Sequence, residues 1–83
     1  MIVNTTPEYM EDLSSLSKDI MIQLKKKVQS IAEHGRPLGH PFRYAPGIWE
    51  GYVGKYRLYY RMNAECLELL RFLHKNFQKK LRF

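Results

Sequence analysis

The sequence predicts a small α+β domain in which two N-terminal helices pack on one face of a twisted antiparallel sheet. Apolar residues recur at helical spacing in the first half, apolar and polar residues alternate in the second half, and a loop rich in proline and glycine separates the two. A short helix or tail is expected over Lys75–Phe83, where Phe77 and Leu81 stand four residues apart. A chain of 83 residues suffices for one domain with a thin core, so we expect a single domain over residues 1–83.

Capping signals set the limits of the two expected helices. Thr6-Pro7-Glu8 combines a hydroxyl cap, a proline at the first helical position and an acid near the positive end of the helix dipole. Ser17 is expected to cap the second helix and Gly35 to end it. The second helix carries an apolar stripe formed by Ile20, Leu24, Val28 and Ile31. Residues 36–47 hold three prolines and two glycines without apolar periodicity, which predicts an ordered loop.

Two expected strands, Ile48–Val53 and Tyr56–Met62, are separated only by Gly54-Lys55. Glycine at the first central position suits a type II′ hairpin turn, and this turn fixes the register. Because side chains alternate between faces, one face gathers Trp49, Val53, Tyr56, Leu58, Tyr60 and Met62. The opposite face gathers Glu50, Tyr52, Arg57, Tyr59 and Arg61. We expect the first face to be core and the second to carry the functional site.

A third strand is expected over Cys66–Leu73, and two registers remain open for it. A two-residue loop sets Glu68 opposite Arg61, a favourable pair, but places Arg71 on the apolar face. A three-residue loop sets Arg71 against Arg57, which places two like charges opposite each other.

The net charge of +6 belongs wholly to the second half of the chain. Residues 1–41 hold five bases and five acids, whereas residues 42–83 hold nine bases and three acids. A clustered positive field attracts nucleic acid and acidic proteins alike. Charge alone therefore predicts a polyanionic partner without choosing its class.

Several classes of protein are excluded by composition. The single Cys66 forms no internal disulfide, and it makes no metal-ligand spacing with the three histidines, so we expect neither a metal nor a cofactor. No apolar run approaches the roughly 20 residues of a membrane helix, and the N-terminus lacks the pattern of a signal peptide. We therefore expect a cytoplasmic protein with no membrane contact.

Three motifs resemble those of the RelE/ParE toxin superfamily across essentially the whole chain. They are Gly47-Ile48-Trp49-Glu50, then Gly54-Lys55-Tyr56-Arg57-Leu58-Tyr59-Tyr60, and finally Leu70-Arg71-Phe72-Leu73-His74-Lys75. The resemblance implies a RelE-like fold and a toxin of a type II toxin-antitoxin system, neutralised by a cognate acidic antitoxin. RelE-like members cut mRNA in the ribosomal A site without a metal, ParE-like members inhibit DNA gyrase, and a degenerate member would retain antitoxin binding alone.

Metal-free RNA cleavage requires a proton acceptor for the 2′-hydroxyl, cations for the phosphate charge and an acid for the leaving oxygen. We expect Arg57 to bind the phosphate, Lys75 to act as a second clamp, and His74 to serve as acid or base. Glu50 is either the proton acceptor or a structural ion-pair partner, and Arg57 either binds the phosphate or only balances the charge of Glu50. Further RNA contacts are expected from Lys55, Arg61, Arg71 and the base-stacking Tyr52 and Tyr59. The two tyrosines suit an antitoxin interface equally well.

The chain departs from the family pattern at two places. Family nucleases often carry further lysines on the strand occupied here by Ile48–Val53, and a tyrosine in the terminal segment. This chain has Glu50 and Tyr52 in the strand and no tyrosine after Tyr60. A mechanism built on lysine and tyrosine is therefore not transferable, and either His74 and Glu50 transfer the protons or the activity is weak.

Overall fold

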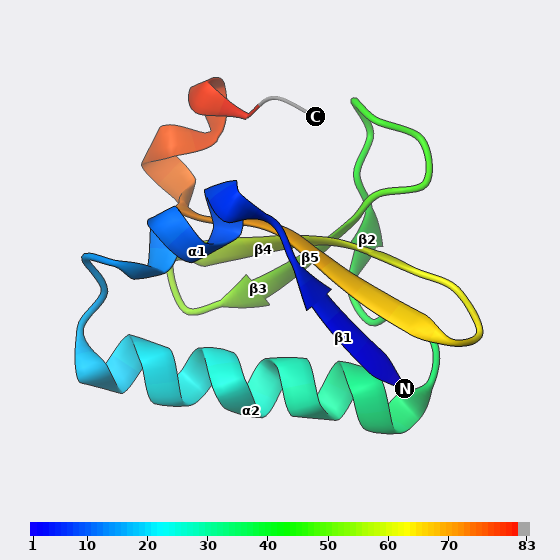
Figure 1. Cartoon of the computed structure of the whole chain (residues 1–83). Coiled ribbons are helices and arrows are strands. Elements are labelled where there is room, and N and C mark those ends of the chain that lie inside the picture. The colour runs from blue at the N-terminus through cyan, green and yellow to red at the C-terminus, as the bar shows by residue number, and fades with distance from the viewer. Residues whose placement is uncertain (82–83) are drawn as a thin grey trace.

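The computed structural model of the chain describes residues 1–81, without the side chains of residues 78–80. The elements follow in the order β1 (Ile2–Thr5), α1 (Pro7–Leu13), α2 (Lys18–His34), β2 (His40–Pro41), β3 (Trp49–Val53), β4 (Tyr56–Met62), β5 (Cys66–His74) and the 3₁₀ helix η1 (Lys75–Lys80). The sheet order is β1-β5-β4-β3-β2. Helix α2 runs along one side of the sheet, whereas η1 and the loop before β3 lie on the other side (Figure 1). This arrangement confirms the predicted α+β fold.

The sheet is mixed rather than wholly antiparallel, which corrects one part of the prediction. Strand β1 pairs in parallel with β5, from Ile2 opposite Cys66 to Thr5 opposite Leu69, while the remaining pairs are antiparallel. The chain between β1 and β5 contains both helices and the strands β2, β3 and β4, so it is long enough for the crossover that a parallel pair needs.

The predicted helix limits are confirmed by their caps. The Thr6 hydroxyl accepts a hydrogen bond from the backbone N–H of Tyr9 at 3.0 Å, and the Ser17 hydroxyl accepts one from Ile20 at 3.4 Å. Gly35 ends α2 with a φ of 66°, the left-handed conformation that glycine adopts at lowest cost. The tail forms one short 3₁₀ helix, kinked at Phe77; residues 82–83 of the predicted tail lie outside the described part.

The β3–β4 hairpin has the register that the sequence predicted. Tyr52 lies opposite Arg57, and Glu50 lies opposite Tyr59. Gly54 has a φ of 58° while Lys55 does not have a positive φ, which matches a type II′ turn. The turn therefore determines which side chains of both strands face α2.

Neither predicted register of β5 is wholly right, because a β-bulge separates two registers. Arg61 pairs with Glu68 as the two-residue loop predicted, but the register then shifts at Tyr59/Tyr60, and Arg71 comes to lie opposite Tyr59. One extra residue on the bulged strand moves every later side chain by one position. The bulge thereby removes Arg71 from the apolar face, where an unbroken register would have placed it.

Both faces of the sheet bury apolar side chains. The main core lies between the sheet and the helices and contains Tyr9, Leu24, Ile31, Val53, Leu58, Tyr60, Leu67, Leu69 and Phe72. Trp49, Tyr56 and Met62 pack against it, as predicted. A second cluster on the opposite face consists of Ile48, Tyr59 and Leu70, covered by Phe42, Ala45 and Leu81. This cluster corrects the expectation that Tyr59 is available for base stacking, because its side chain is 0% exposed.

Tyr60 ties the long loop to the sheet. Its hydroxyl accepts a hydrogen bond from the backbone N–H of Leu38 at 2.9 Å and donates another to the carbonyl oxygen of the same residue. Burial raises the pKa of Tyr60, and the bond to the Leu38 carbonyl opposes this effect. A single hydroxyl therefore satisfies both backbone groups of one loop residue. Within residues 1–81, no helix has the length and apolar character needed to cross a membrane.

We predict that Tyr60→Phe lowers the free energy of unfolding by about 1–3 kcal/mol, because both backbone groups of Leu38 lose their partner. Urea denaturation measures the change. Tyr56→Phe is the matched control: its ring stacks on Phe72 at 5.1 Å, and its hydroxyl makes no hydrogen bond to the described residues, so a change below about 0.5 kcal/mol is expected. Equal losses in both variants would contradict the assigned role of Tyr60.

Candidate nucleic-acid interface

The candidate site lies on the face of the sheet that points away from α2. The register places Glu50, Tyr59 and Arg71 in one row across β3, β4 and β5, and Tyr52, Arg57 and Leu73 in the next row. Residues in such rows have Cβ atoms about 4.5–5.5 Å apart between neighbouring strands. We refer to this surface, opposite α2, as the open face.

Arg57 is held in a defined position on the open face. Its Nη1 donates hydrogen bonds to the carbonyl oxygens of Tyr56 at 3.0 Å and Gly54 at 3.3 Å. The guanidinium carbon lies 4.0 Å from the centre of the Tyr52 ring, a cation–π contact. Tyr52 is itself 49% exposed. The Nε and Nη2 groups of Arg57 donate no hydrogen bond to the described residues, so this part of the fork is available to a ligand.

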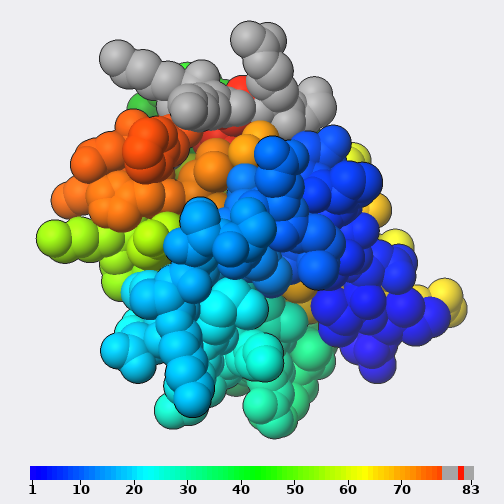
Figure 2. Space-filling view, turned by 60° about the vertical axis from the view of Figure 1, so that its left-hand side comes forward, coloured from blue at the N-terminus to red at the C-terminus, as the bar shows by residue number. Residues whose placement is uncertain are grey.

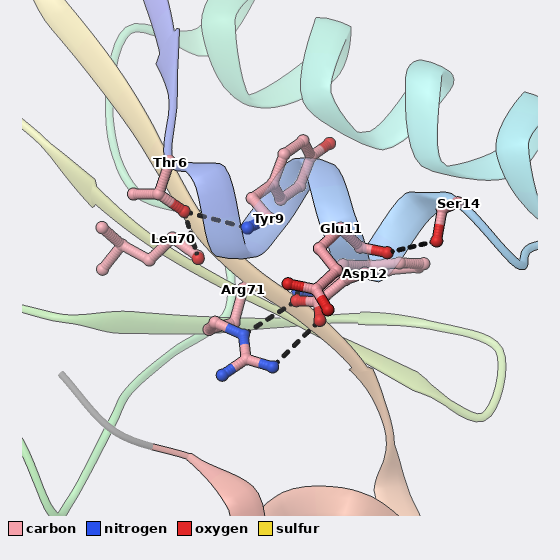
Figure 3. A network of polar contacts seen from close by, with 8 residues as sticks. Thr6, Tyr9, Glu11, Asp12, Ser14, Leu70 and Arg71 are labelled. Atoms are coloured by element: carbon pink, nitrogen blue, oxygen red, sulfur yellow. Dashed lines mark hydrogen bonds and ion pairs between the residues drawn. The ribbon is translucent and has the colours of Figure 1, made fainter.

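Arg71 is neutralised by a partner from α1. Its Nε and Nη2 each donate a hydrogen bond to a carboxylate oxygen of Asp12 at 2.9 Å (Figure 3). Asp12 Oδ2 also accepts a hydrogen bond from the backbone N–H of Phe72 at 2.9 Å. The hydrogen bond to Asp12 raises the pKa of Arg71, while partial burial opposes the rise. The two side chains are only 17% and 8% exposed. Arg71 therefore holds α1 against β5, and the carboxylate of Asp12 neutralises its charge.

Arg61 has a partner as well. Its Nη2 lies 3.3 Å from a carboxylate oxygen of Glu68 on β5, and both side chains are well exposed. An exposed pair of this kind contributes little to stability, but the carboxylate of Glu68 offsets the positive charge of Arg61. Of the three open-face arginines in the predicted site, only Arg57 has no carboxylate within ion-pairing distance among the described residues.

Two lysines lie close to Arg57 at the turn of the hairpin. The backbone N–H of Lys75 donates a hydrogen bond to the carbonyl oxygen of Lys55 at 2.8 Å, so the backbones of the two lysines lie side by side. The β3–β4 turn (yellow-green) borders the segment where β5 passes into η1 (orange) in Figure 2. Arg57 follows Lys55 by two residues on the same strand. We call Lys55, Arg57 and Lys75 the cationic cluster.

Glu50 is positioned by a buried tyrosine. The hydroxyl of Tyr59 donates a hydrogen bond to Glu50 Oε2 at 2.8 Å. Tyr59 is fixed in turn by the second apolar cluster and by a T-shaped ring contact with Phe42 at 5.0 Å. The predicted stacking residue is thus a support for the carboxylate of Glu50.

His74 is not brought to Arg57. It lies opposite Tyr56, whose ring it meets edge-on at 5.3 Å, and Tyr56 packs on the main core. The Nδ1 atom of His74 accepts a hydrogen bond from the backbone N–H of Asn76 at 3.2 Å. The structure therefore separates His74 from the open-face residues Glu50 and Arg57.

His40 also lies on the open face, although it was not among the site residues predicted from the sequence. It lies in β2, opposite Glu50, and its ring centre is 5.6 Å from that of Tyr52. A strand of only two residues inside a proline-rich loop shows no alternation, so no pattern in the sequence places His40 beside the hairpin. Among the described residues, no group of three or more histidine, cysteine or acidic side chains could hold a metal ion.

The structure is similar to chains of several solved toxin-antitoxin complexes. A chain of the RelBE2 complex from Mycobacterium tuberculosis is 26% identical, with a TM-score of 0.75 over 88% of this chain and 95% of that one. Chains of two Escherichia coli complexes, RelBE and DinJ-YafQ, are each 19% identical with TM-scores of 0.76; they cover 88% and 92% of this chain and 94% and 93% of their own. No family model and no curated protein matches the sequence.

We predict that Asp12→Asn destabilises the protein by about 3 kcal/mol, because it leaves the largely buried Arg71 guanidinium without its counter-charge. Glu11→Gln is the matched control, since Glu11 lies on the same helix but is exposed, and it should cost less than about 0.5 kcal/mol. Chemical denaturation of both variants supplies the comparison. An Asp12→Asn protein as stable as the control would show that the ion pair does not hold α1 on β5.

Proposed function

Because the chain belongs by its fold to the RelE-like toxin superfamily, we propose that it is the toxin of a type II toxin-antitoxin system and acts as a ribosome-dependent mRNA endonuclease. The observation that carries the proposal is the placement of Arg57, which lies over Tyr52 and beside two lysines without a carboxylate partner among the described residues. An exposed arginine fork fixed by the backbone is suited to a phosphate group.

Arg57 has the geometry needed to stabilise a phosphodiester during cleavage. Attack of a 2′-hydroxyl on the adjacent phosphorus builds negative charge on the non-bridging oxygens, and pre-oriented donors lower the free energy of that state. The two carbonyls that hold Nη1 leave Nε and Nη2 directed elsewhere. The guanidinium is therefore pre-organised, so little side-chain entropy is lost when the phosphate binds.

Tyr52 and the lysines of the cationic cluster supply binding rather than chemistry. Half of the Tyr52 side chain remains exposed beside Arg57, and such a ring stacks on unpaired bases without regard to sequence. Lys55 and Lys75 add point charges that attract the phosphate backbone, with an affinity that falls as salt increases. Glu50, held by Tyr59, either accepts the 2′-hydroxyl proton or orients the group that does.

The same surface suits an acidic antitoxin. An acidic segment laid over the cationic cluster would neutralise its charge and exclude RNA, which would explain inhibition without a change of fold. The similar structures are of toxins solved together with their antitoxins. Since ribosomes are the proposed target, the protein would act in the cytoplasm.

Expression of the chain without an antitoxin should stop translation before replication. We predict that incorporation of labelled methionine falls first and incorporation of labelled thymidine later. Arg57→Ala should abolish the block, because loss of the phosphate-binding group removes about 3–4 kcal/mol of transition-state stabilisation, or a factor of 10²–10³ in rate. Arg36→Ala, an exposed arginine that follows the C-cap of α2, is the matched control and should remain toxic.

Each alternative has its own outcome in this experiment. An early block of thymidine incorporation with intact translation would replace the nuclease by a gyrase inhibitor. No effect on growth at an expression level confirmed by immunoblot would identify a degenerate toxin that only binds its antitoxin. A folded Arg57→Ala protein that still stops translation would remove Arg57 from the site.

A further inference from the structure

We propose that His40 is a catalytic residue of this site and accepts the proton of the attacking 2′-hydroxyl, with Glu50 opposite it on the same face of the sheet. The inference rests on the proposed nuclease function. It is drawn from three features of the open face: the backbone that fixes His40, the carboxylate opposite it, and the aromatic ring that it shares with Arg57.

The backbone holds His40 in one place although β2 has only two residues. Gly39 has a φ of 111°, and a Cβ at that position would lie 2.3 Å from the carbonyl oxygen of Glu50. Only glycine permits so close an approach of β2 to β3. On the other side, the backbone N–H of Phe42 donates to the carbonyl oxygen of Ile48 at 2.7 Å. His40 is thus anchored from both directions against β3.

The residue opposite His40 is Glu50. Side chains at such cross-strand positions leave the sheet on the same face, with Cβ atoms about 4.5–5.5 Å apart. The hydroxyl of Tyr59 holds that carboxylate at 2.8 Å from below. Glu50 therefore places a negative charge on the face of the sheet that carries His40.

His40 and Arg57 contact the same aromatic ring. The His40 ring lies 5.6 Å from the Tyr52 ring centre, and the guanidinium carbon of Arg57 lies 4.0 Å from it. The distance between the His40 ring centre and the Arg57 guanidinium carbon therefore cannot exceed the sum of these two distances. In the proposed complex a phosphodiester lies over Tyr52, with its non-bridging oxygens toward Arg57 and its 2′-hydroxyl toward His40.

The chemical step then balances in atoms and charge. The 2′-oxygen passes its proton to a neutral imidazole nitrogen of His40 and forms a bond to phosphorus, while the bond between phosphorus and the 5′-oxygen breaks. The departing 5′-oxygen takes a proton from water, and His40 returns its proton to the solvent. The products are a 2′,3′-cyclic phosphate and a 5′-hydroxyl.

The other two histidines lack this setting. His34 lies at the end of α2 with its Nδ1 atom 2.7 Å from the carbonyl oxygen of Ser30. His74 packs edge-on against Tyr56. Both provide matched substitutions of the same residue type away from the open face.

Three charged or titratable groups of the sheet surround His40 on the open face. Glu50 lies opposite it, Tyr52 lies beside it, and Arg57 lies beyond Tyr52. Arg43, from the segment that follows β2, lies over the Tyr44 ring.

The test is the pH dependence of the rate at which the toxin cleaves a defined mRNA on programmed ribosomes. The toxin is in excess over the ribosomes, so that each mRNA is cleaved in a single turnover. The wild-type rate should fall as the pH is lowered through the histidine range, because only neutral imidazole accepts a proton. His40→Gln should lower the rate about 10²–10⁴-fold and leave ribosome co-sedimentation unchanged. It should also abolish the fall in rate at low pH, which is the acidic limb of the pH profile. His34→Gln and His74→Gln should keep both the rate and the limb.

The failure of this proposal and that of the proposed function are distinguishable. A His40→Gln protein that cleaves at the wild-type rate, or slowly with the acidic limb retained, overturns the assignment of His40 while the nuclease stands. Wild-type protein that binds ribosomes but cleaves no mRNA overturns the nuclease, and the assignment of His40 falls with it.

Discussion

The two-residue turn at Gly54-Lys55 is the constraint on which the rest of the structure depends. It fixes the register of β3 against β4, and in a strand the register decides which face every side chain occupies. A slip of one residue would exchange Arg57 with Leu58, placing a guanidinium in the main core and an apolar side chain on the open face. Fold and site are therefore encoded by the same turn.

The open face is not a uniform basic surface. The second apolar cluster covers the middle of this face and buries Tyr59. Two of its arginines, Arg71 and Arg61, form ion pairs with Asp12 and Glu68. What remains available is the end nearest the turn, where the cationic cluster lies beside Tyr52. The net charge of the chain thus overstates the positive charge of the open face, because Asp12 and Glu68 neutralise two of its arginines.

The sequence predicted the features that depend on local chemistry. Helix caps at Thr6 and Ser17, the type II′ turn and the alternation of the hairpin all follow from residues close together in the chain, and all are found. The bulge that carries Arg71 to the row of Tyr59 depends on contacts between β4, β5 and α1, which no local pattern expresses. Alternation likewise assigned Tyr59 to the correct face but could not show that a loop and the tail cover it. His40 was missed for the same reason, since its strand exists only through its pairing with β3.

Photocrosslinking on programmed ribosomes tests most directly whether the open face contacts RNA. A photoreactive phenylalanine derivative in place of Tyr52 keeps an aromatic ring beside Arg57, and the same derivative in place of Ile22, an exposed residue of α2, labels the opposite side of the sheet. We predict crosslinks to mRNA from position 52 and none from position 22. Crosslinks from position 22 with none from position 52 would show that RNA binds the helical side.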